Sequence, residues 1–477
     1  MALVRRVWAD GDELDLSKVE MRVYSGREDQ LPDPLIEAKQ GTGKAPAYRG
    51  LAYVVFERLP LDDFGNRLPL LQFEVVRPVG RLEEMVRAVT VIPGATEHGY
   101  ATTPIKEKTG EGAARILNRN TLTAPSDWQA SIDELQALCP NLQDVALVVS
   151  WFGTDLRAGH CRVVPGVEVE SRNESRSWRV SGLTRSEARL VSRHDGGPAY
   201  GGTPDDRSVI EAIADLKARG LKVTLYPFVM MDIPDGNGLA DPYGGGEQAA
   251  YPWRGRITCH PAPGRPGSPN RSAAITGLVA DFCGTARAAD FDVSGTRVSY
   301  EGAGEGYRRM VLHYALLAAQ AGGVDGFLIG SELRGLTTLR DASDGFPFVE
   351  ALCSLAAEVR AILGSSAKIT YGADWSEYFG HHPADGSGDV FFHLDPLWAH
   401  PAIDAVGIDN YTPLSDWRDA DLENPNPDGF RLADDAGAMA RQITAGEGFD
   451  WFYASEADRA ARIRSPISDG LAGKPWV

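Results

Sequence analysis

Patterns of buried strands and amphipathic helices alternate along most of the chain. Short apolar runs between polar or turn residues are typical of strands covered on both faces, as in a parallel sheet. A poorer candidate of the same kind lies at residues 189–192. The sequence therefore predicts six strands. The five with the clearer apolar pattern are residues 145–151, 222–226, 324–331, 368–374 and 405–411.

Helix signals precede these strands. Ser126 and Gln129 have the spacing of a capping box ahead of an apolar stripe, and later helices stop at Gly220, Gly322 and Gly364. A repeated helix, glycine stop and buried strand is typical of parallel β/α units, which form a barrel or a doubly wound sheet. The pattern therefore predicts an α/β fold. A closed eight-stranded barrel would lack its last two strands.

The first part of the chain has a different texture. Its best strands are residues 52–57 and 71–76, and the segment between them supplies the Pro, Asp, Gly and Asn of a connecting loop. We predict a β-rich assembly domain over residues 1–95 and the β/α domain over residues 96–477. Both ends of the sequence suggest a fragment or a truncated reading frame, because a strand pattern begins at Val4 and the chain stops on Trp476 and Val477.

Composition narrows the class of protein. The 477 residues suffice for a large α/β domain and a smaller companion. A net charge of -18 disfavours nucleic-acid binding, which needs a basic face. Five scattered cysteines without a C-x-x-C pair fit reduced thiols in a protein made in the cytoplasm. No apolar run predicts a membrane span or a signal peptide, so a role outside the cell would need an exit such as lysis.

Glu332 is the leading candidate for chemistry. It follows the strand predicted over residues 324–331, and the C-terminal ends of parallel strands carry the active sites of α/β folds. The alternative is that Ser331 caps a following helix and Glu332 complements the helix dipole in its first turn. This segment alone supports both interpretations equally.

Other polar and aromatic side chains are expected at the same edge of the sheet. Mixed carboxylates and exposed aromatic rings suit carbohydrate, because sugar faces stack on rings and sugar hydroxyls need acceptors. Any single aromatic residue of this set could instead belong to the core. The candidate substrate-binding residues are Trp151, His194, Asp232, Asp374, Trp375, Asn410 and Tyr411.

Hydrolysis of a glycoside needs two carboxyl groups, about 5 Å apart for retention and roughly 6.5–9.5 Å apart for inversion. Glu332 is the candidate acid/base, and Asp409 and Glu456 are the candidates for its partner. Asp409 could simply anchor its own turn. Glu456 follows Ser455, so a place in the first turn of a capped helix is the favoured interpretation for it.

One long segment and several weaker motifs complete the candidates. Residues 232–272 are rich in Gly and Pro and long enough for a lid or a binding loop. The histidines at 381, 382 and 393 lack metal-ligand spacing, and the glycines at 302–306 do not fit a dinucleotide loop. No metal and no cofactor are expected.

Several blocks resemble a known family. Residues 8–11 (WADG), 29–36 (DQLPDPLI), 46–57 (PAYRGLAYVVFE) and 64–67 (FGNR) are similar to the large tail-tip protein of gene transfer agents and related tailed phages. Residues 330–333 (GSEL) and 409–411 (DNY) resemble its glycoside-hydrolase-like TIM-barrel domain. The resemblance implies a small β-rich tail-hub (baseplate hub) domain followed by a (β/α)8 TIM-barrel-like domain, incomplete at the C-terminus, in a particle tail tip.

The resemblance also implies roles and partners. Glu332 would be the acid/base at strand four of a retaining enzyme, and the nucleophile at strand seven would come after Val477. Other tail or baseplate proteins and a bacterial envelope glycan would be the partners.

Three functions stay open from the sequence. The leading hypothesis is a tail-tip protein whose barrel binds, and in its active form hydrolyses, recipient-cell surface glycan or peptidoglycan. The alternatives are a free-standing soluble glycoside hydrolase and a non-catalytic glycan-binding barrel.

Overall fold

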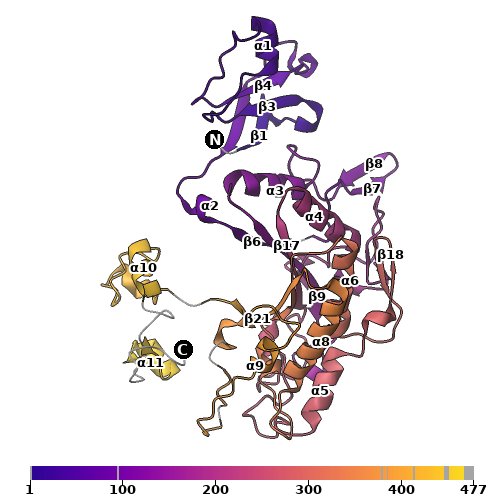
Figure 1. Cartoon of the computed structure of the whole chain (residues 1–477), viewed down its shortest axis with the longest axis vertical. Helices are drawn as coiled ribbons and strands as arrows, with labels where there is room; N and C mark the ends of the chain where they lie inside the picture. The colour runs from indigo at the N-terminus through magenta and orange to yellow at the C-terminus, as the bar shows by residue number, and fades with distance from the viewer. Residues whose placement is uncertain are drawn as a thin grey trace.

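The fold has three parts along the chain (Figure 1): a β-rich N-terminal part, a parallel sheet with helices, and a small C-terminal part. A helix long and apolar enough to cross a membrane does not occur among the described residues. The computed structural model describes residues 3–93, 96–377, 380–383, 385–411, 414–444 and 451–466.

The N-terminal part is built from two small sheets and one helix. Asp33 caps the helix by accepting from the backbone N–H groups of Leu35 and Ile36. Its carboxylate also accepts from Arg22 Nε at 2.8 Å and from the Tyr24 hydroxyl at 2.7 Å, which ties the helix to a strand. The sheets are β2-β1-β5 and β3-β4. The elements are β1 (Leu3–Ala9), β2 (Asp12–Glu13), β3 (Glu20–Tyr24), α1 (Pro34–Gln40), β4 (Tyr53–Glu57) and β5 (Leu71–Val76), and the two strands predicted here are confirmed.

Six parallel strands form half of a barrel-like sheet. Their order is β6-β9-β17-β20-β21-β22, and every neighbouring pair is parallel. This confirms the α/β class and the five better strand predictions. The bounds are β6 (Ala88–Val91), β9 (Asp144–Gly153), β17 (Lys222–Met231), β20 (Gly326–Ser331), β21 (Lys368–Asp374) and β22 (Gly407–Asp409).

One expectation about the sheet is wrong, and its first strand was not expected. Residues 189–192 do not form a barrel strand: β14 (Arg189–Leu190) pairs only with the short β11 (Gly166–Val167), outside the main sheet. The first parallel strand is instead β6, which pairs with β9 from Ala88↔Asp144 to Val91↔Leu147. A domain boundary at residue 95 therefore falls after the first strand of the sheet, and four residues were too short a signal to separate β6 from the preceding β-rich part.

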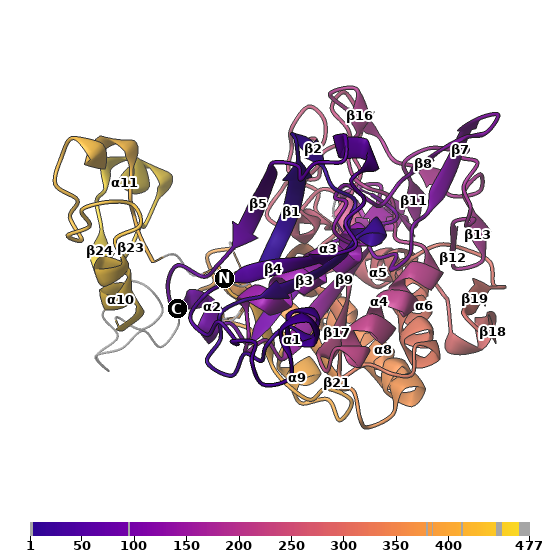
Figure 2. The same cartoon turned by 90° about the horizontal axis from the view of Figure 1, so that it is seen from above.

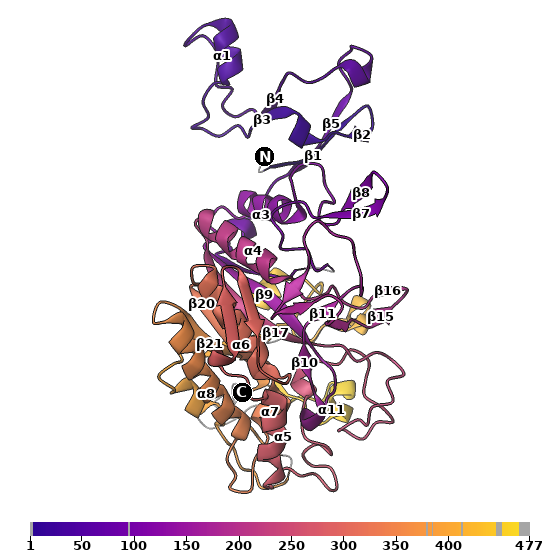
Figure 3. The same ribbon diagram turned by 90° about the vertical axis from the view of Figure 1, so that its right-hand side faces the viewer.

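Helices cover the outer face of the sheet (Figures 1 and 3). Along β9 the side chains alternate, so that Leu147, Val149 and Trp151 are fully buried against the helices while Ser150 and Phe152 face the other side. Ser126 caps its helix by accepting from the Gln129 N–H, as predicted. The covering helices are α3 (Asp127–Leu138), α4 (Asp206–Ala218), α5 (Ala274–Cys283), α6 (Tyr307–Gln320) and α8 (Pro347–Leu363).

Insertions follow the second and third strands. The first spans about residues 154–205 and folds into short strands. The second spans residues 232–273 and includes the 3-10 helix η4 (Arg254–Arg256). The remaining short elements are α2 (Leu82–Met85), β7 (Lys106–Gly110), β8 (Ala113–Ile116), β10 (Val163–Val164), β12 (Arg179–Val180), β13 (Leu183–Thr184), β15 (Arg193–His194), β16 (Gly197–Pro198), β18 (Phe291–Ser294), β19 (Arg297–Tyr300), α7 (Arg334–Thr337) and α9 (Asp395–Trp398).

The C-terminal part lies apart from the sheet (Figure 2). It contains α10 (Ala436–Thr444), β23 (Trp451–Phe452), α11 (Glu456–Ala461) and β24 (Ser465–Pro466). Ser455 caps α11 by accepting from the Asp458 N–H, which confirms the expected capped helix. Glu456 therefore opens a helix that is separate from the strand ends of the sheet.

Candidate active site

A cavity of about 640 Å³ lies on the inner face of the half-barrel. Alternate residues of the second and third strands line it, because only every second side chain of a strand faces this side. Its wall mixes aromatic rings with carboxylates, an arrangement that suits a sugar ligand. The lining residues include Ser150 and Phe152 of β9, Tyr226, Phe228 and Met230 of β17, Tyr200, Arg254, Glu332, Asp409 and Tyr411.

Glu332 reaches this cavity through an irregular end of the fourth parallel strand. The register of β20 against β21 shifts between Leu328 and Ser331, as at a β-bulge, and such bulges re-aim side chains next to active sites. Gly330 is required there, because a Cβ atom would lie 1.7 Å from the Tyr307 hydroxyl oxygen. Glu332 itself has φ +52°, a left-handed conformation that is uncommon outside glycine and is concentrated at functional sites.

Two hydrogen bonds fix this backbone. The Glu332 N–H donates to the Gly372 carbonyl at 2.8 Å, and the Leu333 N–H donates to the Tyr371 hydroxyl oxygen at 2.7 Å. The following helix α7 begins at Arg334 with Leu333 at its N-cap position. Ser331 is therefore the last residue of a strand and not a helix cap, so the strand-end interpretation of Glu332 is confirmed.

The long insertion after β17 supplies the partners of the Glu332 carboxylate. Trp253 Nε1 donates to Glu332 Oε2 at 2.7 Å, and Arg254 Nη2 lies 3.0 Å from the same oxygen. Arg254 also donates to the Ser331 carbonyl at 2.9 Å and stacks over the Phe228 ring at 3.5 Å. Its guanidinium is thus held in place before any ligand arrives.

Burial raises the pKa of Glu332, since the charged form loses solvation. The Arg254 charge and the Trp253 hydrogen bond oppose this rise, while the charges of Asp409 and Asp374 add to it. The net effect is a raised pKa. A carboxyl group whose pKa is raised holds its proton to higher pH, which is the property that a general acid needs.

Asp409 is the second carboxylate in the cavity. It ends β22, and its Oδ2 accepts from the Tyr226 hydroxyl at 2.7 Å across the sheet. Burial, with the nearby Asp409 charge, raises the pKa of Tyr226, so this phenol stays a proton donor. Tyr411 lies two residues further on, lines the cavity and is 69% exposed.

Trp151 does not belong to the site. Its ring is fully buried on the outer face of β9, where Nε1 donates to the Tyr314 hydroxyl of α6 at 3.1 Å. The odd-numbered residues of this strand face the helices, so Trp151 is a core residue and its neighbour Phe152 lines the cavity instead. The prediction that Trp151 contacts substrate is therefore wrong, because its side chain lies on the opposite face of the strand from the cavity.

Asp232 and His194 also lie outside the cavity lining. Asp232 is 1% exposed, and its carboxylate accepts from Arg189 Nε at 2.8 Å and from the Ser192 N–H at 3.2 Å. It anchors the first insertion to the end of β17 and is not open to a ligand. His194 is exposed on β15, and its ring centroid lies 5.8 Å from that of Tyr251. The Tyr251 ring in turn contacts the ring of Tyr200, which lines the cavity.

Three predicted residues at the last strand ends are close to the cavity but do not line it. Asp374 is buried and accepts from the Ser376 N–H at 3.1 Å, so it holds its own turn. Trp375 is half-buried in the following 3-10 helix η6 (Trp375–Glu377), and Asn410 is exposed after β22. Their assignment to substrate binding stays a prediction.

Sequence reasoning missed Trp253, Arg254 and Tyr226. The first two lie in the segment singled out as a lid or binding loop, and an adjacent Trp and Arg in such a loop was an available signal. Tyr226 was counted only as part of a strand. Within the described ranges, no group of three or more His, Cys, Asp or Glu side chains is placed to hold a metal ion.

Comparison with known proteins bears on the second half of the chain. Residues 305–477 match the family model of the GTA TIM-barrel-like domain, which includes β20, β21 and β22. A search of curated proteins gives no match.

Three solved structures show further similarity. One chain in the virion of a native gene transfer agent (GTA) particle is 62% identical, over 16% of this chain and 17% of that chain, with a TM-score of 0.15. A GH113 β-1,4-mannanase in complex is 17% identical over 59% of this chain and 55% of that one, with a TM-score of 0.28. The GH113 β-mannanase AaManA from Alicyclobacillus acidocaldarius is 18% identical over 57% and 53%, with a TM-score of 0.27.

The matched region spans about a sixth of the particle chain and about half of each mannanase. The fold assignment comes from the strand order and the family model. Residues 305–477 thus match the GTA TIM-barrel-like domain family, which confirms the resemblance of the chain to gene transfer agent proteins with a TIM-barrel-like domain.

Proposed function

We propose that this chain is a tail-tip component whose half-barrel binds and hydrolyses a surface glycan or peptidoglycan of the recipient cell. The observation that carries the proposal is Glu332, which opens from the fourth parallel strand into a cavity that also holds Asp409 and several aromatic rings. The tail-tip position is proposed from the family resemblance, which implies a hub domain followed along the chain by the barrel domain.

The chemistry assigned to Glu332 is that of the general acid/base. Its raised pKa supports transfer of a proton to the glycosidic oxygen, and the same carboxylate would later activate water. Tyr411, which is 69% exposed and lines the cavity, offers a ring face for stacking with a sugar unit. Asp409 is the candidate second carboxylate, and retention would need a nucleophile about 5 Å from Glu332, which the family resemblance assigns to strand seven.

A non-catalytic glycan-binding barrel is the second candidate. The observation in its favour is the Arg254 guanidinium 3.0 Å from Glu332, because an ion pair favours the ionised carboxylate over the acid. In that case the cavity would bind sugar without cleaving it, and Glu332 would serve as a hydrogen-bond acceptor.

Incubation with purified envelope glycan and peptidoglycan separates these possibilities. Binding is followed by co-sedimentation, and cleavage by the release of reducing ends. Binding with release supports the enzyme, and binding without release supports the binder. The absence of both would overturn the proposed function.

The tail-tip position has its own test. An antibody against the chain, viewed on negatively stained particles, is expected to label one end of the tail. If the antibody labels only protein that is not attached to particles, and the tails carry no label, the result would favour a free-standing soluble glycoside hydrolase.

A further inference from the structure

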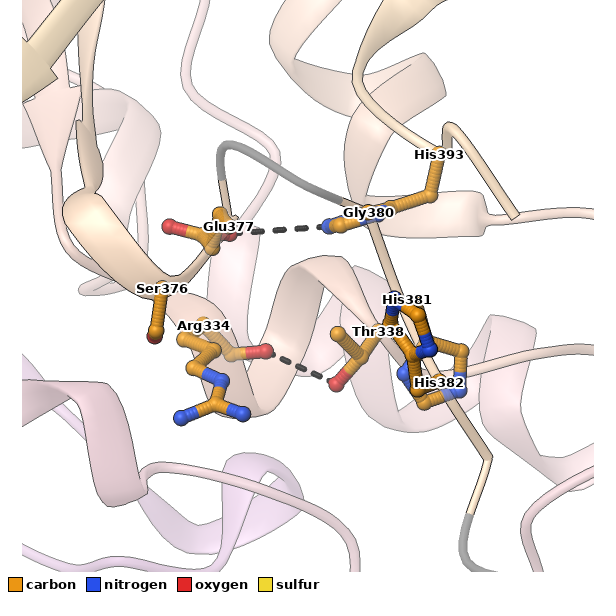
Figure 4. Close-up of a pocket in the computed structure, with 8 residues that line it drawn as sticks. All are labelled: Arg334, Thr338, Ser376, Glu377, Gly380, His381, His382 and His393. Atoms are coloured by element: carbon orange, nitrogen blue, oxygen red, sulfur yellow. Dashed lines mark hydrogen bonds and ion pairs between the residues drawn. The ribbon is translucent and has the colours of Figure 1, made fainter. Parts of the chain in front are cut away.

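A second, smaller pocket of about 270 Å³ adjoins the segments that follow Glu332 and Asp374. We call it the histidine pocket. In Figure 4 the side chains of Arg334 and Ser376 lie on one side of it and those of His381 and His382 on the other. It is smaller than the roughly 300–1,000 Å³ of drug-sized sites, so it fits one sugar unit better than a longer segment. Its lining residues are Arg334, Thr338, Ser376, Glu377, Gly380, His381, His382 and His393.

Arg334 is the free cation of this pocket. It is exposed, and its guanidinium makes no hydrogen bond or ion pair with any residue in the part of the chain that the structure describes. Arg340, six residues later, differs in being buried and within 3.4 Å of Asp344. An unpaired guanidinium in a pocket wall is a ready partner for a carboxylate or a phosphate.

The buried imidazole of His393 is the pocket's second unsatisfied group. It is 2% exposed, and its Nε2 has no hydrogen-bond partner among the described residues. Its Nδ1 lies 3.3 Å from the Phe391 carbonyl, which can only accept, so Nδ1 is the donor. In the neutral ring Nε2 is then an acceptor, and it lies 3.6 Å from Glu377 Oε1, which is beyond hydrogen-bond distance.

Two hydroxyl groups of the lining are further acceptors. The Thr338 hydroxyl already donates to the Arg334 carbonyl at 2.8 Å, and the Ser376 hydroxyl already donates to Asp374. Their oxygens are left to accept. Both Glu377 oxygens are occupied, by the Thr337 hydroxyl at 2.5 Å and by the Asp374 N–H at 2.9 Å. Burial and neighbouring cationic groups lower the pKa of His381 to about 4, so this ring is neutral at pH 7.

One free cation among hydrogen-bond acceptors matches a particular ligand. Sugar hydroxyls are donors that acceptors satisfy, and an anionic substituent would pair with Arg334. We propose that the histidine pocket is a subsite for an acidic sugar unit, with its carboxylate or phosphate on Arg334 and its hydroxyls on His393 and Thr338. The inference rests on the proposed glycan binding in the larger cavity, because Arg334 is only two residues beyond Glu332.

The net charge of the chain makes this preference testable. At -18 the protein as a whole repels an anion, so tighter binding of an acidic sugar requires a local cation. The probes are a galacturonic acid hexamer and the same hexamer with its carboxyl groups reduced to alcohols. Calorimetry is expected to give about tenfold or more tighter binding of the acidic hexamer by the full chain.

Arg334→Gln is expected to abolish the difference between the two hexamers, and Arg334→Lys to restore part of it. Arg77→Gln is the matched control, because Arg77 is exposed, lies in the connection between β5 and α2, and makes no side-chain hydrogen bond or ion pair with the described residues. This control should leave both affinities unchanged. Competition by mannose 6-phosphate then distinguishes the source of the anion: displacement of the acidic hexamer supports phosphate as well as carboxylate, and no displacement supports carboxylate alone.

Equal affinity of the wild type for both hexamers, or an acid preference that survives in Arg334→Gln, would overturn the subsite. Both outcomes leave glycan binding itself intact. Failure of the proposed function looks different, because then neither hexamer nor any envelope glycan fraction would bind.

Discussion

Asp232 and Glu332 occupy equivalent positions at the ends of neighbouring strands, but only one of the two carboxylates is open to the cavity. Each follows directly the last residue of a parallel strand, and the two strands, β17 and β20, are neighbours in the sheet. Glu332 lines the cavity, whereas Asp232 is closed off by Arg189 and the Ser192 N–H.

The difference comes from the insertions. The first insertion places Arg189 over the end of β17 and uses Asp232 as its anchor. The second places Trp253 and Arg254 beside Glu332 but leaves the carboxylate in the cavity wall. A strand-end position is therefore necessary for a role in the site, but the loops that cover the strand ends decide which acid keeps access to a ligand.

The largest expected contrast between the two acids is in turnover. If the chain hydrolyses glycan, Glu332→Gln is expected to lower the rate about 10²–10⁴-fold, the usual contribution of general acid–base catalysis. Asp232→Asn should leave the rate unchanged, because that carboxylate does not face the cavity. Reducing-end release from envelope glycan measures both. Equal rates for wild type and Glu332→Gln would remove Glu332 from catalysis.

Stability should show the reverse order. Asp232→Ala leaves Arg189 and the Ser192 N–H without their acceptor, which is expected to cost about 2–3 kcal/mol because Arg189 is partly exposed. Glu332→Gln should change the free energy of unfolding by less than about 1 kcal/mol, because the amide oxygen can still accept from Trp253 and Arg254, and the raised pKa means that burial already offsets the ion pair with Arg254. Urea unfolding at neutral pH compares them, and a larger loss for Glu332→Gln would contradict the anchoring role of Asp232.

Asp409 is intermediate between the two acids, because it lines the cavity but keeps one firm partner. Tyr226→Phe removes that hydroxyl and is expected to lower the free energy of unfolding by about 0.5–1.5 kcal/mol. Tyr411→Phe is the control, since Tyr411 is exposed in the same cavity. Equal effects in the two variants would show that the bond to Asp409 adds no stability.

The smallest effect concerns the pH profile. The Trp253 N–H favours ionised Glu332, so Trp253→Phe is expected to raise the pKa of Glu332 further. Because a general acid with a higher pKa stays protonated to higher pH, the alkaline limit of kcat/KM should move to higher pH. A profile that is unchanged, or that moves to lower pH, would mean that this hydrogen bond does not control the acid.

Local patterns predicted the parallel β/α repeat well. The strand over residues 368–374 has the predicted bounds, and Ser126 and Ser455 cap helices as expected. These features depend on residues a few positions apart, which periodicity and capping rules describe. The first strand, β6, was missed because its four residues carry no such pattern of their own.

The amino-acid sequence by itself determined the alternation of helices and buried strands and made Glu332 the leading candidate for a strand end. Only the tertiary structure decided that Trp151 faces the helices, that Arg189 covers Asp232, and that Trp253 and Arg254 meet Glu332 from 79 and 78 residues away. The physical reason is range: strand and helix periods are set by neighbouring residues, whereas access to a carboxylate depends on which distant loop packs over it.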